Sequence, residues 1–172
     1  KNNRRRFNIA GRPESIRVLV IETLPRWEYR FIRNALSRDP GVDVDCLLLH
    51  PQLGEGDGPD YITAFPDELE DLQKYDVVFV GDVGVGEGML TKEQAELLKG
   101  LVENQASGIV FIPGWQGHQF SLSDTELWNL LPVVLDEEMK DGQEEATASP
   151  LSLTTEGRSS LLTMLGDTEE EN

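Results

Sequence analysis

The chain has 172 residues, of which 38% are hydrophobic, so it is long enough to form one domain with a buried core. Its formal charge of −17 at pH 7 repels phosphate groups, which argues against nucleic acid as a partner. A single cysteine, Cys46, excludes an internal disulfide and a thiol-based metal cluster. No run of about 18 apolar residues is present, so we expect no direct membrane insertion of this stretch.

The two ends of the chain differ in charge from the middle. Residues 1–15 include the basic run KNNRRR and are interpreted as a linker. Residues 136–172 contain the acidic runs DEEMKDGQEE and DTEEE, which predict a solvated and only partly ordered extension. The remaining residues, 16–135, are therefore expected to form the folded domain.

The first predicted strand and helix lie at the start of this domain. RVLVI, residues 17–21, is an apolar run of strand length, and the segment PRWEYRFIRNALSRDPG follows it. In that segment Trp27, Phe31 and Ala35 recur at helical spacing, with Ile32 and Leu36 alongside, which predicts that they form the buried face of a helix. The Pro-Gly pair at its end stops the helix.

The second and third predicted strands differ in how apolar they are. Residues 42–50, VDVDCLLLH, alternate at first and then become apolar, which favours a strand at the edge of the sheet. Cys46 lies inside this strand and is interpreted as a packed core residue. A short helix is expected around residues 67–73, and DVVFV, residues 76–80, is apolar throughout and therefore central.

A capping pattern predicts the next helix. Thr91 and Gln94 have the spacing of a capping box, in which each side chain satisfies the other residue's free amide. The helix that they start is expected over residues 91–103. GIVFI, residues 108–112, is the fourth predicted strand.

The last predicted elements have weaker patterns. Ser123 and Glu126 repeat the capping spacing before a helix that places Trp128 on its apolar side. Farther along, residues 151–155 predict a short strand and residues 159–165 a helical turn or two.

Strands that alternate with helices are typical of an α/β fold with a mostly parallel sheet covered on both faces. With right-handed crossovers, this order predicts a three-layer, flavodoxin-like sandwich. The strands are expected in the order 2-1-3-4 across the sheet.

Polar residues follow each predicted strand at its carboxyl end, where ligands of open parallel sheets bind. Both histidines of the chain belong to this group. The candidate ligand-binding residues that we expect at this edge, with Thr23 beside them, are Glu22, Arg26, His50, Asp82, Trp115, Gln116 and His118.

Histidine and carboxylate side chains at one edge are also the ligands of zinc sites and the groups of acid-base chemistry. No HxH or HExxH pair places two of them on one element, so we expect no metal and interpret them as partly solvated loop residues. The glycine-rich stretch at 81–88, GDVGVGEG, lacks GxGxxG spacing and is interpreted as a loop, so no cofactor is predicted. For Trp115 two interpretations stay open, a lid over a pocket and packing over the edge of the sheet.

Four segments resemble one known family. They are RVLVIETLPRWEYRFIRNALSRDPGVDVDCLLLHP, YDVVFVGDV, LTKEQAELLKGLVENQASGIVFIPG and LWNLLPVVL. Together they resemble the glutamine amidotransferase-like domain of large bacterial membrane proteins, which often also carry von Willebrand A or aerotolerance-operon (Bat-type) regions. The resemblance covers residues 16–135 and implies the class I glutamine amidotransferase fold. It also implies a place outside the cytoplasmic membrane.

Active members of that superfamily carry a cysteine nucleophile in a GxCxG turn after a central strand. The matching stretch here is Gly-Trp-Gln-Gly-His at 114–118, so Trp115 or Gln116 takes the place of the nucleophile. The downstream histidine of the family's triad is also missing, because His118 is the last histidine in the chain. We therefore expect no catalytic residue and no glutamine hydrolysis, while the amides of the turn are expected to suit a small anion or a peptide carboxylate.

Two functional hypotheses follow. The first is a non-catalytic binding or scaffolding module of a larger, membrane-tethered bacterial protein, whose partners are other domains of the same protein or another protein. The alternative is a hydrolase that uses a metal or a carboxylate and histidine site at the same edge, with His50, Asp82 and His118 as the acting residues.

Overall fold

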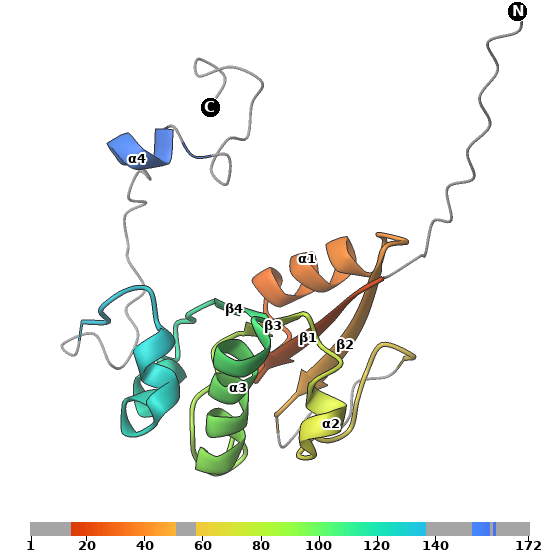
Figure 1. Ribbon diagram of the computed structural model, residues 1–172, viewed down its shortest axis with the longest axis horizontal. Helices are drawn as coiled ribbons and strands as arrows, with labels where there is room; N and C mark the ends of the chain where they lie inside the picture. Colours follow the sequence, from red (N-terminus) through yellow and green to blue (C-terminus); the bar gives the residue numbers. More distant parts are fainter. Residues whose placement is uncertain (1–14, 51–57, 137–152, 159, 161–172) are drawn as a thin grey trace, which may run out of the picture.

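The protein is an α/β sandwich built on a four-stranded, all-parallel sheet (Figure 1). The structure is a computed structural model that describes residues 15–50, 58–136, 153–158 and 160. Its strands follow the order β2-β1-β3-β4, which confirms the predicted order. Their bounds are β1 (Ile16–Glu22), β2 (Val42–Leu48), β3 (Val77–Val80) and β4 (Gly108–Phe111).

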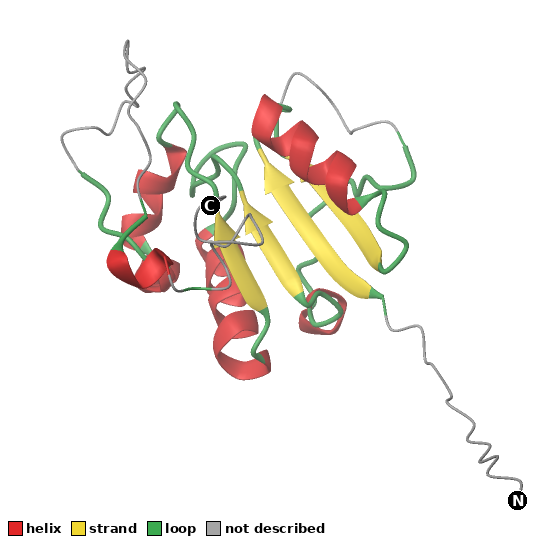
Figure 2. Ribbon diagram, turned by 90° about the horizontal axis from the view of Figure 1, so that it is seen from above, coloured by secondary structure: helices red, strands yellow, loops and turns green. Residues whose placement is uncertain are grey.

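Helices cover both faces of the sheet, as expected for a flavodoxin-like three-layer sandwich (Figure 2). Helix α1 (Trp27–Leu36) lies on one face, and α2 (Leu69–Leu72) and α3 (Lys92–Gln105) lie on the other. Three short elements complete the described part of the chain: the 3-10 helices η1 (His118–Asp124) and η2 (Glu126–Leu130), and helix α4 (Thr155–Arg158).

The core has two parts because side chains of a strand alternate between the faces of the sheet. Leu19 and Ile21 of β1 pack with α2, α3 and the 3-10 helices, whereas Val18 and Val20 pack toward α1. All four are at most 3% exposed. The central strand is thus buried on both faces, as in parallel sheets generally.

The outer edge of β2 is covered by a later part of the chain. The amide of Cys46 donates to the Asp60 carbonyl at 2.7 Å, and the amide of Ile62 donates to the Cys46 carbonyl at 2.9 Å. Cys46 is fully buried, which confirms its interpretation as a core residue. Burial raises the pKa of its thiol, so the reactive thiolate form is disfavoured.

Helix α3 begins with the predicted capping box. The Gln94 amide donates to the Thr91 hydroxyl at 3.1 Å, and the Thr91 amide donates to the Gln94 side chain at 2.9 Å. The helix ends at Ala106, whose left-handed backbone conformation (φ 58°) closes the last turn.

The second predicted capping box, Ser123 with Glu126, is wrong. Thr125 has an extended backbone and separates η1 from η2, so no α-helix begins at Ser123. The amide of Glu126 instead donates to the Glu96 side chain of α3 at 3.0 Å. Because the Glu126 amide is bonded to a residue of another helix, Ser123 and Glu126 do not form a capping box despite their spacing.

The predicted burial of the Trp27, Phe31 and Ala35 stripe is also wrong. Trp27 is 70% exposed and Phe31 67%, and their rings stack on each other with centroids 6.0 Å apart. Leu36, which the pattern places alongside them, does pack toward the sheet, together with Tyr29. Arg26, at the N-cap of the helix, is bonded to the end of β1 and to the chain after β4.

Trp128 packs against the core from η2, as predicted, although it stays partly exposed. The expected strand at 151–155 is not formed by residues 153–155, because Thr155 begins α4. Residues 151–152, most of the predicted turn at 159–165, and nearly all of the linker (1–15) and acidic extension (136–172) lie outside the described residues. No helix in the described ranges has both the length and the apolar character to cross a bilayer.

Replacing Thr91 with Ala removes one side of the capping box, so the free energy of unfolding should fall by about 1 kcal/mol. Ser123→Ala is the matched control, because this exposed serine caps no helix, and its effect should stay within about 0.5 kcal/mol. Urea unfolding of both variants measures the difference. Equal losses in the two variants would contradict the assignment.

Candidate functional site

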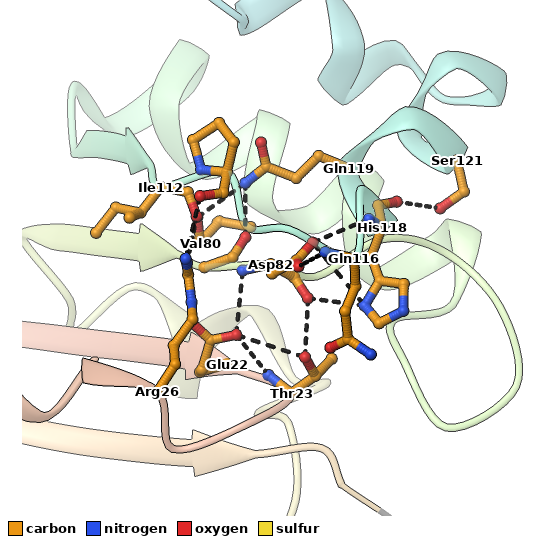
Figure 3. A network of polar contacts seen from close by, with 12 residues as sticks. Glu22, Thr23, Arg26, Val80, Asp82, Ile112, Gln116, His118, Gln119 and Ser121 are labelled. Carbon is orange, nitrogen blue, oxygen red and sulfur yellow. Dashed lines mark hydrogen bonds and ion pairs between the residues drawn. The ribbon is translucent and has the colours of Figure 1, made fainter. Parts of the chain in front are cut away.

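Two buried carboxylates, Glu22 and Asp82, lie at the carboxyl-terminal edge of the sheet (Figure 3). Glu22 is the last residue of β1, and Asp82 follows β3 by two positions. Each residue is only 2% exposed. Because a buried charge is costly unless it is bonded, the partners of these two side chains define the chemistry of the edge.

Glu22 joins the ends of three strands. Its Oε1 accepts from the amides of Thr23 (2.9 Å) and Asp82 (3.1 Å), and its Oε2 accepts from Nε of Arg26 at 2.7 Å. The remaining guanidinium nitrogens of Arg26 donate to the carbonyls of Ile112 and Pro113, directly after β4. Each of the three guanidinium nitrogens of Arg26 therefore has an acceptor within the protein, so this side chain is held in place by the ends of β1 and β4.

Asp82 holds the turn that follows β4. Its Oδ2 accepts from the Gln116 amide and its Oδ1 from the His118 amide, both at 2.9 Å. Gly114 lies so close to this carboxylate that a Cβ there would overlap it. The two amides that the sequence suggests for an anion or a peptide carboxylate thus already bind the protein's own anion.

The backbone of this turn is relaxed. Gly117 has φ 66° and ψ 21°, whereas the only described non-glycine residue with positive φ is Ala106, far from the turn in sequence. Trp115 and Gln116 therefore have ordinary φ angles. The turn leads into the 3-10 helix η1 rather than an α-helix. A strained nucleophile turn followed by the amino end of an α-helix is absent from residues 112–124.

The ring of His118 is oriented by the backbone of Asp82. Its Nδ1 lies 3.0 Å from the Asp82 carbonyl oxygen, which can only accept, so Nδ1 carries the proton and Nε2 of the neutral ring is an acceptor. The hydroxyl of Thr23 donates to the same carbonyl at 3.0 Å. One backbone oxygen thus fixes two polar side chains beside each other.

A pocket of about 210 Å³ opens at this edge. Four loops contribute to it, one after each strand of the sheet. The residues that line it are Thr23, Leu49, His50, Glu87, Gly88, Met89, Gln116 and His118.

The structure divides the sequence-predicted residues into three groups. His50, Gln116 and His118 line the pocket, together with Thr23. Glu22, Arg26 and Asp82 form the buried network described above (Figure 3). Trp115 is 64% exposed and does not line the pocket, so the structure gives it neither a lid contact nor a packed position.

Sequence reasoning missed three contributors. Glu87 and Met89 reach the pocket from the glycine-rich loop, which had no motif to mark them. Gln119 is 1% exposed, and its Nε2 donates to the carbonyls of Val80 (3.2 Å) and Gly81 (2.6 Å) at the end of β3. Its Oε1 has no hydrogen-bond partner in the part of the chain that the structure describes. A single glutamine between polar and aromatic neighbours gives no signal of such a role.

Within the described ranges, no group of three or more His, Cys, Asp or Glu side chains is arranged to hold a metal ion. Comparison with protein-family models, curated proteins and solved structures finds no match to this chain. The resemblance to glutamine amidotransferase-like domains therefore stays a prediction from the four segments that show it.

Asp82→Asn places an amide nitrogen against backbone donors, so one buried N–H loses its acceptor. We expect the free energy of unfolding to fall by at least about 2 kcal/mol, measured by urea unfolding. Glu87→Gln, which makes the same chemical change on the exposed rim of the pocket, should stay within about 0.5 kcal/mol. If Asp82→Asn left the free energy of unfolding nearly unchanged, the carboxylate would not be what holds the turn.

Proposed function

We propose that this domain is a non-catalytic, amidotransferase-like binding module of a larger, membrane-tethered bacterial protein. The observation that supports this most strongly is the position of Asp82, whose carboxylate occupies the two amides of the turn where an active relative would stabilise an oxyanion. A turn that is already filled by an internal anion is suited to rigidity rather than to acyl transfer.

The position of the only thiol supports the same proposal. Cys46 is fully buried in β2 and packs on the α1 side of the sheet, away from the turn after β4. Ser121 is the hydroxyl nearest in sequence to the turn, and it donates to the backbone carbonyl of His118 rather than to its ring. Neither side chain is placed as a nucleophile beside an imidazole base.

The membrane-tethered setting and the extracytoplasmic side are proposed from the family resemblance. Proteins with the resembling domain usually carry it between spanning helices, outside the cytoplasmic membrane. In that setting the partners are other domains of the same protein or a second protein.

The pocket at the sheet edge is the proposed ligand site of this module. Its lining offers acceptors, namely the Glu87 carboxylate and Nε2 of His118, and the chain as a whole is strongly acidic. A ligand that donates hydrogen bonds, such as an ammonium group or the amino end of a peptide, fits this lining better than an anion does.

The hydrolase alternative retains one supporting observation, because His50 and His118 line the same pocket. Its third acting residue, Asp82, is 2% exposed and bonded to two amides, so it has no surface on which to meet a substrate. Metal analysis of the purified chain separates the two proposals, since stoichiometric zinc or manganese would favour the hydrolase.

The full chain incubated with L-glutamine should release no ammonia above the buffer rate, because the turn presents no nucleophile. A coupled glutamate dehydrogenase assay measures this release, and Cys46→Ala should give the same result as the unchanged protein. Clear turnover that Cys46→Ala abolishes would overturn the proposal.

Glycinamide, which carries an ammonium group and an amide donor, should bind the pocket saturably with a dissociation constant in about the millimolar range. NMR titration of the ¹⁵N-labelled chain should show shifts of His50 and His118 that weaken in Glu87→Gln. Trp115→Ala, outside the pocket, is the control and should leave the affinity unchanged. If acetate bound at these residues with the same affinity as glycinamide, the proposed ligand class would be contradicted.

A further inference from the structure

The outer side of helix α1 carries an exposed aromatic stripe, formed by Trp27, Phe31 and Ala35. Trp27 is 70% exposed and Phe31 67%, and their rings stack on each other with centroids 6.0 Å apart. Ala35, one turn farther along, is exposed as well. Three apolar residues that recur every four positions are typical of a helix face that packs on another surface. In the single chain this face is left open to solvent.

Positive charge accompanies the aromatic stripe. The guanidinium of Arg30 lies over the Trp27 ring, 5.8 Å from its centroid, and Arg38 is exposed just beyond the end of the helix. Neither arginine forms an ion pair with a carboxylate of the described residues. Glu28, the acidic residue of this helix, lies 3.9 Å from Arg26 instead. The outer side of α1 is thus cationic and aromatic, although the formal charge of the chain is −17.

A groove lies on the opposite face of the sheet from α1, between α2 and α3. It has a volume of about 460 Å³ and is larger than the pocket at the sheet edge. The residues that line it are Leu69, Gln73, Glu93, Glu96, Leu97, Gly100, Asn104 and Gln105. None of them lines that pocket.

The floor of the groove is apolar. Leu69 is 48% exposed although it starts a helix that packs on the core, and Leu97 is only partly covered. A Cβ at Gly100 would meet nothing closer than the Asn104 side chain at 3.6 Å, so the absence of a side chain at this position leaves room in the groove. An exposed leucine beside a hollow of this size is typical of a surface that binds an apolar side chain.

The rim of the groove is acidic. Glu93 and Glu96, one turn apart on α3, both line it. Neither has a Lys or Arg ion-pair partner in the part of the chain that the structure describes. The Glu96 side chain accepts one backbone amide, from Glu126. An occupant that combines positive charge with apolar side chains would therefore complement both the floor and the rim.

The outer side of α1 has the chemistry and the length that the groove needs. The aromatic stripe extends about 12 Å along its helix, and the lining from Glu93 to Asn104 extends about 17 Å along α3. A helix that places apolar anchors one turn apart into an apolar groove is a common mode of recognition. The unpaired Arg30 beside these anchors is opposite in charge to the acidic rim.

The two surfaces cannot meet within one copy of the chain. Helix α1 lies on one face of the sheet, and α2 and α3 lie on the other (Figure 1). Because one chain carries both halves of a complementary pair on opposite faces, the occupant that fits the groove is α1 of a second copy. One such contact leaves a free groove on one copy and a free α1 on the other, so the contact can repeat.

We propose that copies of this domain associate head to tail, with the aromatic stripe of one copy in the groove between α2 and α3 of the next. Trp27 and Phe31 lie on the leucine floor, and Arg30 lies beside the acidic rim. The pocket at the sheet edge takes no part in this contact, so the association is independent of the ligand proposed for that pocket.

Sedimentation velocity of the full chain tests this association. The average sedimentation coefficient should rise from micromolar to millimolar concentration and pass the value of a dimer, because head-to-tail contacts do not stop at two copies. Phe31→Asp puts a charge on the apolar floor and Gly100→Leu fills the groove, so each should weaken the association at least about tenfold. Both variants should keep the far-ultraviolet circular dichroism of the original, since Phe31 is exposed and leucine favours a helix more than glycine does.

An equimolar mixture of these two variants tests the head-to-tail arrangement itself. Each variant keeps one intact surface, so α1 of the Gly100→Leu copy can occupy the groove of the Phe31→Asp copy. The mixture should therefore form dimers of one copy of each and nothing larger, at concentrations where either variant alone is monomeric. Misfolded variants could not restore binding to each other, so this gain separates a lost surface from a lost fold.

Arg30→Glu should weaken the association severalfold, because it opposes the acidic rim with a like charge. Two controls make matched changes at exposed residues outside both surfaces: Trp115→Asp for Phe31→Asp, and Arg158→Glu for Arg30→Glu. Both controls should associate as the original does. An original chain that stays monomeric up to millimolar concentration would overturn the proposal. A mixture of Phe31→Asp and Gly100→Leu that stays monomeric while the original associates, or controls that lose as much as the variants, would overturn it as well.

Discussion

The carboxylate of Asp82 is the constraint on which the functional edge of this protein depends. It accepts the amides of Gln116 and His118 from the turn after β4, and its own amide donates to Glu22 at the end of β1. Glu22 in turn binds Arg26, which reaches the carbonyls after β4. Both buried charges are stable because every charged oxygen has a donor, so the ends of β1, β3 and β4 are held as one unit.

This arrangement gives the turn a structural role. In an acyl-transfer enzyme, the amides at such a turn are unoccupied and stabilise the negative charge that develops on the substrate. Here a carboxylate from the loop after the neighbouring strand β3 accepts these amides, and Gly114 leaves just enough room for it. The same residue positions the pocket, because its carbonyl holds the His118 ring and the Thr23 hydroxyl. A rigid floor under a small polar pocket is suited to binding.

Much of the fold could be predicted because its signals are local. The capping box at Thr91 and Gln94 depends on two residues three positions apart, and the strand order depends on apolar runs that alternate with helices. The stripe at Trp27 and Phe31 was misassigned for a tertiary reason. Helix α1 has apolar residues on two sides, and packing against the sheet buries Tyr29 while Trp27 and Phe31 stay exposed.

The candidate site could be predicted in position but not in detail. Sequence order placed Glu22, His50, Asp82 and His118 at one edge, where the structure has them. It could not tell which of them face a ligand, because that depends on backbone amides rather than on side-chain types. Gln119 had no signal at all, since its bonds are to carbonyls at the end of β3, which are distant in sequence.

Through-hydrogen-bond NMR couplings in the uniformly ¹³C,¹⁵N-labelled chain test the central claim most directly. We predict couplings from the amide nitrogens of both Gln116 and His118 to the carboxylate carbon of Asp82, and amide resonances that do not move when phosphate is added. Missing couplings, together with saturable shifts of these two amides in phosphate, would show that the turn is open to an outside anion and would contradict the account.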